Sequence, residues 1–215
     1  MRIYTLQVGE IGTNCYLAAS DAGNAAIVDP GAEPERIAAA LTQYSLTPAL
    51  ILLTHGHFDH IGAAEALRQW YHIPLYVHAA DAELLSDPAK NGGKGLMGRE
   101  VTAGCDHLLV DGDRIPLDEL EFQVIHTPGH TKGSVCFAAD GLLLTGLEYA
   151  DIMNGMSTAA VSRRSGALFP GWLRWKGTGA SSPGTALPPP STRNGLKIPT
   201  WGNAYDDPSV LRQPL

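Results

Sequence analysis

The stretch of this chain that is richest in reactive side chains is THGHFDH, residues 54–60, which places three imidazoles and one carboxylate in a single short segment. His55 and His57 are two residues apart, so both can point toward one ion in an extended turn, while Asp59 and His60 can face a neighbouring ion. Imidazole and carboxylate are the ligands that borderline divalent metals prefer, and neutral imidazole is available at physiological pH. Surface histidines in a polar loop are the alternative, but four metal-capable side chains directly after a buried strand favour a metal site.

A second histidine motif, HTPGHT at residues 126–131, again follows an apolar segment. His130 lies beyond the Pro-Gly turn and can project into the same site. His126 ends a predicted strand, where a hydrogen-bonded packing role is more common than a ligand role. The remaining histidines are interpreted as packing or surface residues: His72, His78 and His107.

The segments around these motifs predict strands with intervening helices. Short apolar or alternating segments separated by turn residues predict an opening β-meander at 3–8, 14–19 and 25–29. The apolar run ALILL at 49–53 predicts a strand covered on both faces that leads into the THGHFDH motif. Helices are predicted at 33–44, 61–71 and 80–86, and further strands at 75–78, 122–125, 134–138 and 142–144. The glycine-rich residues 87–104 predict a loop over the site, and the whole pattern indicates a layered α/β architecture.

Composition limits the class of protein. The chain has 215 residues with 44% hydrophobic content, which suits one medium-sized domain with a substantial core. A net charge of -7 argues against nucleic acid or a membrane as partner. The partner that we expect is a small-molecule substrate. Three cysteines without CxxC spacing are interpreted as small buried hydrophobes, and with no signal-like N-terminus we expect a cytoplasmic protein.

The motifs THGHFDH and HTPGHTKGS resemble those of the metallo-β-lactamase superfamily, and specifically its small glyoxalase II-like (hydroxyacylglutathione hydrolase-like) thioesterase branch. TNCYL, IVDPG, the HxHxDH cluster, TPGHT and LLLTG occur in the family's order across residues 1 to about 146. The resemblance implies a four-layered αβ/βα sandwich, here with an incomplete or disordered C-terminal part. It also implies metals at the edge between two sheets.

The same resemblance implies the roles of individual residues. His55, His57 and His130 would hold the first metal, and Asp59 and His60 would belong to the second, with Asp59 also counted as catalytic. The cofactor would be one or two Zn²⁺ ions, with Fe or Mn as alternatives, and metal-bound hydroxide would attack a thioester carbonyl, as in an acylglutathione. Asp29 and Thr54 match positions that orient the ligands by hydrogen bonds, although a role as turn and strand-end polar residues stays open.

Residues after about 147 depart from this pattern. The family follows LLLTG with a metal-bridging aspartate, yet Leu147 follows Gly146 here, and no histidine occurs after His130. Residues 148–215 also hold eight of the fifteen prolines and three of the four tryptophans. We therefore divide the chain into a metallo-β-lactamase-like domain at 1–147 and a tail outside the family at 148–215, which we expect to be poorly ordered.

The composition of the tail suggests a shifted reading frame. Each amino acid fixes most of the first two bases of its codon, so the sequence can be read in another frame. When the last base of each codon is joined to the first two of the next, residues 182–201 can encode PGHGPASTIDAERLENPYL, which resembles the family's missing C-terminal motif. The hypothesis is a frame shift near Thr145 to Glu148, by a deletion in the gene or an error in its sequence. A genuine divergent proline-rich tail is the alternative.

Without the bridging carboxylate and the final histidine, the printed chain is expected to have weak or absent hydrolase activity. Two other classes of function stay in play. One is a single-iron oxidoreductase of the sulfur-dioxygenase kind, and the other is a non-catalytic metal-binding remnant.

Overall fold

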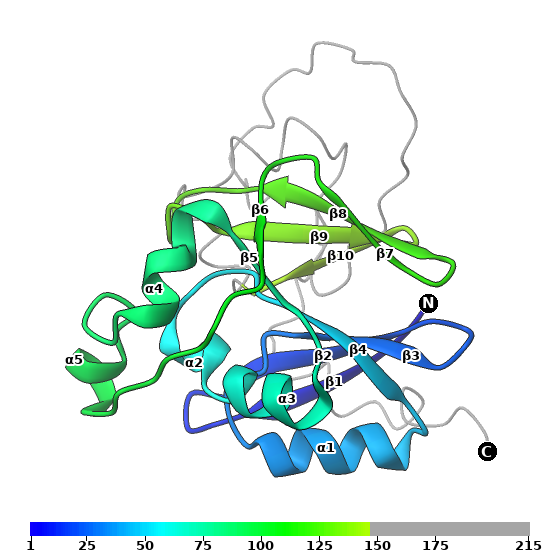
Figure 1. Cartoon of the computed structure of the whole chain (residues 1–215), viewed down its shortest axis with the longest axis horizontal. Helices are drawn as coiled ribbons and strands as arrows, with labels where there is room; N and C mark the ends of the chain where they lie inside the picture. The colour runs from blue at the N-terminus through cyan, green and yellow to red at the C-terminus, as the bar shows by residue number, and fades with distance from the viewer. Residues whose placement is uncertain (147–215) are drawn as a thin grey trace, which may run out of the picture. The chain divides into compact units, whose positions relative to one another are not determined.

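The structure of the chain is a computed structural model that describes residues 1–146. The predicted tail, with its proposed frame shift and its expected lack of order, lies outside the described residues. Two sheets and a set of helices make up the described part (Figure 1). The first sheet has the strand order β1-β2-β3-β4-β5-β6, with β1 (Arg2–Val8), β2 (Thr13–Ala19), β3 (Asn24–Val28), β4 (Thr47–Leu52), β5 (Leu75–His78) and β6 (His107–Leu109). The second has the order β10-β9-β8-β7, with β7 (Arg114–Leu117), β8 (Leu120–His126), β9 (Val135–Ala139) and β10 (Leu142–Thr145).

Helices cover the outer face of the first sheet, where α1 and α3 lie below its strands in Figure 1. The helical segments are α1 (Pro34–Gln43), α2 (Phe58–Ile61), α3 (Ala64–Tyr71), the short 3₁₀ segment η1 (Ala79–Asp81), α4 (Ala82–Ser86) and α5 (Gly93–Met97). One apolar core lies between these helices and the first sheet, and includes Ile37, Ile51 and Leu67. A second core lies between the two sheets, and includes Leu52, Phe122 and Phe137. Helices, sheet and sheet are three layers of the predicted αβ/βα sandwich; the fourth layer would fall on residues outside the described part.

The strand directions bring the ends of several strands to one edge. β3, β4, β5 and β6 run parallel, so their carboxyl ends meet at the same edge of the first sheet. In the second sheet β8 and β10 both pair antiparallel with β9, so they too end on a common side. A backbone hydrogen bond from the Val135 N–H to the Thr54 carbonyl (2.8 Å) joins the two sheets there. Both histidine motifs therefore begin at this junction.

The structure corrects several expectations for local structure. Most of the predicted helix at 61–71 is α3, but its first residue, Ile61, ends the separate helix α2, and Gly62 and Ala63 lie between the two. The predicted loop at 87–104 contains α5, whose flanking glycines Gly92 and Gly98 both have positive φ and so end the helix on each side. β6 and β7 were not predicted, because each is short and β7 contains a proline. Cys15 and Cys136 are buried as expected, but Cys105 is exposed.

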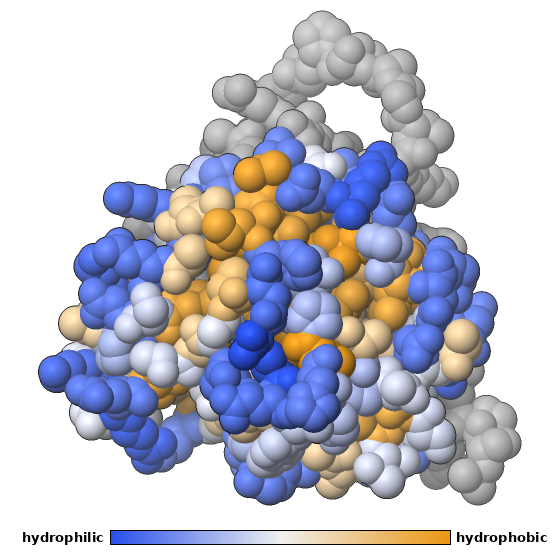
Figure 2. Space-filling model, in the orientation of Figure 1, coloured by the Kyte–Doolittle hydropathy of each residue, from blue (hydrophilic) through white to orange (hydrophobic). Residues whose placement is uncertain are grey.

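The surface of the described part carries both charged and apolar side chains. Figure 2 shows apolar side chains across the middle of the face that it draws. Leu108 and Val110, in and just after β6, are among the exposed large apolar residues. Among the helices of residues 1–146, none is long and apolar enough to cross a membrane.

Candidate metal centre

Three imidazoles converge where the two sheets meet. His55 and His57 come from the turn after β4, and His130 comes from the turn between β8 and β9. One nitrogen atom from each ring lies within 4.8 Å of the other two. His57 Nδ1 and His130 Nε2 are 2.9 Å apart, while the buried His55 Nε2 has no hydrogen-bond partner. A buried nitrogen without a partner is costly unless a cation takes the place of the missing donor, so this trio fits a metal ion.

Asp59 and His60 lie beside the trio, on α2. The His60 and His55 ring centroids are 4.0 Å apart, and His60 Nε2 is 3.4 Å from Asp59 Oδ2. The Thr13 hydroxyl donates to the same Asp59 oxygen (2.9 Å), which fixes the carboxylate. Thr13 was not singled out from the sequence, because a lone hydroxyl at a strand start carries no signal of its own. The five predicted ligand residues are thus all brought together.

Two buried polar residues, Asp29 and Thr54, contact the predicted metal ligands. Asp29 has no exposed surface and accepts hydrogen bonds from the Thr54 N–H (2.8 Å) and the Thr54 hydroxyl (2.6 Å). Thr54 Oγ1 is 3.2 Å from His55 Nδ1, and Asp29 Oδ2 is 3.1 Å from His60 Nδ1, although that nitrogen is not aligned for a hydrogen bond. Asp29 and Thr54 therefore contact two of the predicted ligands, which is the orienting geometry that the sequence left open.

Backbone contacts hold α2 against the turn after β3. Asp29 itself has a positive φ of 51°, and the Ala63 N–H donates to the Pro30 carbonyl (2.8 Å). Gly31 lies so close to the Asp59 carbonyl that a Cβ atom at this position would overlap it. The glycine of the IVDPG motif is therefore required by the close approach of two backbones at the site.

Electrostatics separate the histidines into two kinds. Burial, followed by the neighbouring imidazoles, holds the pKa of His55 well below its ordinary value. Burial and then His130 lower the pKa of His57. Burial also opposes a charge on His60, but Asp29 and Asp59 outweigh it and raise the pKa of His60. His55 and His57 are thus neutral imidazoles with lone pairs available for a metal, which is the form that binds.

The last described residue lies against the same groups. A Cβ atom on Gly146 would overlap the Thr54 hydroxyl and would lie 2.7 Å from Asp29 Oδ2 and 3.1 Å from His60 Cε1. The end of β10 therefore reaches the side of the site that Asp59 and His60 occupy.

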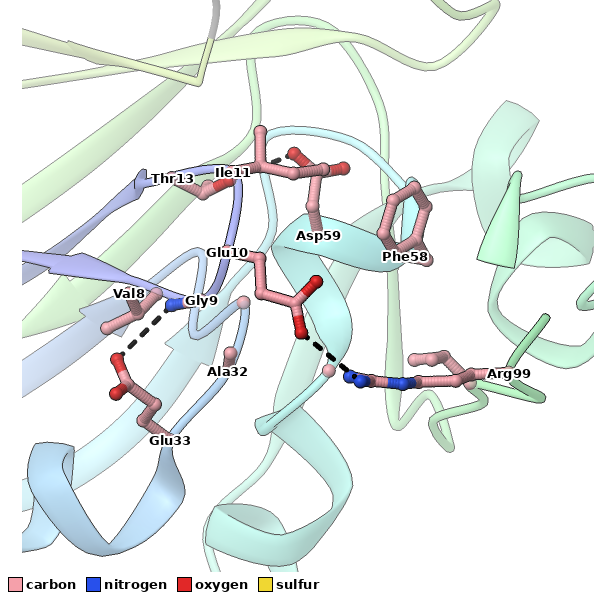
Figure 3. A pocket seen from close by; sticks show the side chains of 13 residues that line it. Val8, Gly9, Glu10, Ile11, Thr13, Ala32, Glu33, Phe58, Asp59 and Arg99 are labelled. Carbon is pink, nitrogen blue, oxygen red and sulfur yellow. Dashed lines mark hydrogen bonds and ion pairs between the residues drawn. The ribbon is translucent and has the colours of Figure 1, made fainter. Parts of the chain in front are cut away.

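A groove opens next to Asp59, lined by residues of the turn between β1 and β2, of the turn after β3 and of α2 (Figure 3). Its volume is about 270 Å³, and its lining combines apolar side chains such as Ile11, Phe58 and Val101 with the Asp59 carboxylate. Glu10, from the turn between β1 and β2, forms an exposed ion pair with Arg99 (3.2 Å) across the groove. A small molecule in the groove would therefore meet apolar contacts, the Arg99 guanidinium, the carboxylates of Glu10 and Glu33, and Asp59 at the edge of the metal centre.

The other histidines lie outside this cluster. His126 Nε2 lies 2.8 Å from the Lys132 carbonyl oxygen, and its ring stacks on His78 with centroids 4.1 Å apart. His107 stacks on Tyr76, and His72 ends α3 in the left-handed conformation. All four are packing or surface residues, as predicted from the sequence.

Comparisons with known proteins point to one superfamily. The model of the metallo-beta-lactamase superfamily matches residues 8–146. The chain is 36% identical over 165 residues to the probable metallo-hydrolase YqgX of Bacillus subtilis, covering 72% of this chain and 78% of that protein. It is 30% identical to the hydroxyacylglutathione hydrolase GloC of Haemophilus influenzae, covering 79% of this chain and 85% of that protein. Among solved structures, the BLEG-1 B3 metallo-beta-lactamase is 36% identical with a TM-score of 0.64, covering 72% of this chain and 85% of that one.

Proposed function

Because this chain belongs to the metallo-beta-lactamase superfamily, we propose that its site is that of a metal-dependent hydrolase of thioesters of the acylglutathione kind. The observation that carries the proposal is the convergence of His55, His57 and His130, with a buried His55 nitrogen that has no partner in the protein. The thioester class is supported by the similarity to GloC over most of both chains. The metal itself would be zinc, with iron or manganese as alternatives.

Each proposed ligand has a defined task. His55, His57 and His130 would hold the first ion through one ring nitrogen each, and Asp59 and His60 would contribute to a second. A divalent ion held there would supply Lewis-acid chemistry, which activates water as a nucleophile and polarises a carbonyl. Asp59 is kept in place by the Thr13 hydroxyl, so its second carboxylate oxygen stays free of that bond and can orient or accept a proton from the attacking water.

The groove beside Asp59 is the proposed location of the acyl substrate. Phe58 and Ile11 would pack against its apolar part. Acylglutathione carries a net negative charge, and Arg99 supplies a guanidinium at the groove, although it is shared with Glu10. The lining also holds the carboxylates of Glu10, Glu33 and Asp59, so binding of an anionic thioester would depend on Arg99 and on the charge of the metal ions.

The printed chain is proposed to be weakly active or inactive. It has Leu147 where the family has the bridging aspartate, and no histidine after His130. Because Gly146 lies against Thr54 and approaches His60, a carboxylate one residue further on would begin beside the second pair of ligands. We propose that the frame shift near Thr145 to Glu148 removed that carboxylate, and sequencing the source DNA across codons 141–151 tests this directly.

The experiment on function compares two full-length chains, the printed one and one with the frame restored after Gly146. Both are purified and their metal content is measured by mass spectrometry, and hydrolysis of S-lactoylglutathione is followed by the release of glutathione. We expect the restored chain to hydrolyse the thioester and the printed chain to be at least about 100-fold slower, because an ordered ligand set has lost two members. A restored chain that binds metal but hydrolyses no thioester would refute the proposed activity.

Variants of the restored chain test the site itself. His130→Gln should reduce both metal content and turnover, whereas the matched control His107→Gln, on an exposed strand residue, should change neither. Tight metal binding without turnover would point to a non-catalytic remnant. Bound iron together with oxygen uptake would instead favour the sulfur-dioxygenase class.

A further inference from the structure

Asp81 is a buried carboxylate that the metal centre described above does not use as a ligand. It lies at the end of η1, after β5, with 1% of its surface exposed. None of the ion pairs among residues 1–146 involves it. A buried charge without an ionic partner is retained only when hydrogen bonds compensate it, so its donors identify what it does.

The donors to Asp81 come from both histidine motifs. Asp81 Oδ2 accepts from the Gly56 N–H (3.0 Å), and Gly56 is the residue between His55 and His57. The same oxygen accepts from the Thr131 hydroxyl (2.6 Å), and Thr131 directly follows His130. The other oxygen, Oδ1, accepts from the Gly133 N–H (2.7 Å). One carboxylate therefore joins the turn after β4, in the first sheet, to the turn between β8 and β9, in the second.

The packing around these donors leaves little freedom. A Cβ atom on Gly133 would lie 2.7 Å from Asp81 Cγ, and a Cβ atom on Gly56 would lie 2.6 Å from Leu84 Cβ and 3.2 Å from the Asp81 carbonyl. The two turns are therefore held at the distance that the carboxylate sets. His55 and His57 lie on one side of this link and His130 on the other, and His57 Nδ1 and His130 Nε2 are 2.9 Å apart.

We propose that Asp81 is a positioning residue for the metal centre, which sets the spacing between the His55–His57 pair and His130 without touching the ion. The inference rests on the proposed function only in that the three histidines hold a metal. The proposed role requires a carboxylate at position 81, because this side chain must accept hydrogen bonds from two backbone N–H groups and one hydroxyl at the same time. An amide of the same shape cannot do so, because its NH₂ group would face at least one backbone N–H.

A second inter-sheet carboxylate offers a matched control. Asp118, in the turn between β7 and β8, accepts from the Ser20 hydroxyl (2.6 Å) and from the Asn24 amide (2.9 and 3.1 Å). It also joins the first sheet to the second, but at the opposite end of β8 from His126. Asp118→Asn therefore loosens the contact between the sheets without touching either histidine motif.

The test uses the full 215-residue chain in its metal-free form. The protein is titrated with Co²⁺, and binding is followed by the visible d–d absorption of the ion. We expect Asp81→Asn to bind Co²⁺ about 10- to 100-fold more weakly than the parent chain and to show an altered absorption band. Asp118→Asn should bind as the parent does, with an unchanged band. Thermal unfolding of both metal-free variants reports the structural loss separately from the effect on the ion.

A parent chain that binds no Co²⁺ would remove the proposed metal site and this inference with it. Parent-like binding by Asp81→Asn, or equal weakening in Asp118→Asn, would overturn the role of Asp81 and leave the metal site standing. If Asp81→Asn does not fold, Thr131→Val and Thr131→Ser decide the matter. Thr131→Val should bind Co²⁺ several-fold more weakly than the parent chain. Thr131→Ser should bind it as the parent does, because it keeps the hydroxyl that donates to Asp81. Parent-like binding by Thr131→Val would then overturn the proposal.

Discussion

The stability of the metal-free chain should pass through a maximum near pH 6.5, because the site holds histidines whose pKa values are shifted in opposite directions. Folding lowers the pKa of His55 and His57, chiefly by burial, and raises the pKa of His60, where Asp29 outweighs burial. Below about pH 6.5 the unfolded chain takes up protons that folded His55 and His57 do not, so stability falls as the pH falls. Above it, folded His60 keeps a proton that the unfolded chain releases, so stability falls as the pH rises.

The size of each limb follows from proton counting. A difference of one bound proton between the folded and unfolded chains changes the free energy of unfolding by about 1.4 kcal/mol per pH unit. His55 is almost fully buried and contributes most of the acid limb, while the half-buried His57 is partly screened by solvent. We expect a loss of roughly 1 kcal/mol or more from pH 6.5 to 5.5. The loss from pH 6.5 to 7.5 should be smaller, on the order of a few tenths of a kcal/mol, because the protons that unfolded His55 and His57 still release there offset part of the His60 effect.

Urea unfolding of the full chain in the presence of a chelator, at half-unit steps from pH 5 to 8, measures both limbs by linear extrapolation. The range stops there because burial raises the pKa of Cys15 and Cys136, which adds a further loss at higher pH. His60→Gln should flatten the alkaline limb and leave the acid limb in place. A stability that is constant or rises steadily across this range would refute the reasoning.

Three further predictions concern single substitutions. Asp29→Ala leaves the Thr54 N–H and hydroxyl without an acceptor in a buried position. The free energy of unfolding, measured by urea denaturation, should therefore fall by about 2–5 kcal/mol. A decrease of less than about 1 kcal/mol would contradict this explanation. Gly31→Ala forces a Cβ atom into the Asp59 carbonyl and should lower the thermal midpoint of the metal-free chain well beyond the effect of Gly95→Ala, where a Cβ atom meets nothing within 4 Å. Arg99→Ala breaks only an exposed ion pair, so the free energy of unfolding should change by less than about 1 kcal/mol. In the restored chain, the same substitution should raise KM for S-lactoylglutathione and leave kcat unchanged. An unchanged KM would exclude Arg99 from substrate binding.

The sequence predicted most of the elements that carry a strong hydrophobic pattern. The apolar run ALILL is β4, and the expected helix at 33–44 is α1, with boundaries within a residue or two. The short strands β6 and β7 were missed because three or four residues give no period to recognise, and each is defined by pairing with a distant partner. The helix α5 was missed because glycine-rich composition indicates a loop when tertiary contacts are unknown.

The ligand set was predicted from residue types, but its supporting groups were not. His55, His57, Asp59 and His60 are adjacent in the sequence, and the family motif adds His130. Thr13 donates to a residue 46 positions further along the chain, and Asp81 accepts from residues that are 25 to 52 positions away. A single threonine or aspartate has no local sequence pattern that distinguishes it from a surface residue. Long-range polar contacts of this kind become visible only when the fold is known.

The convergence of the histidine trio has a consequence for the order of folding. His57 and His130 are 73 residues apart in sequence, so the entropy of closing a long loop must be overcome before they can meet. His55 and His57 can contact an ion early in folding. The nitrogen of His130 reaches the same ion only when the hairpin of β8 and β9 has docked on β4. We therefore expect tight metal capture to coincide with the last docking step, so that the ion locks a nearly finished structure and does not nucleate it.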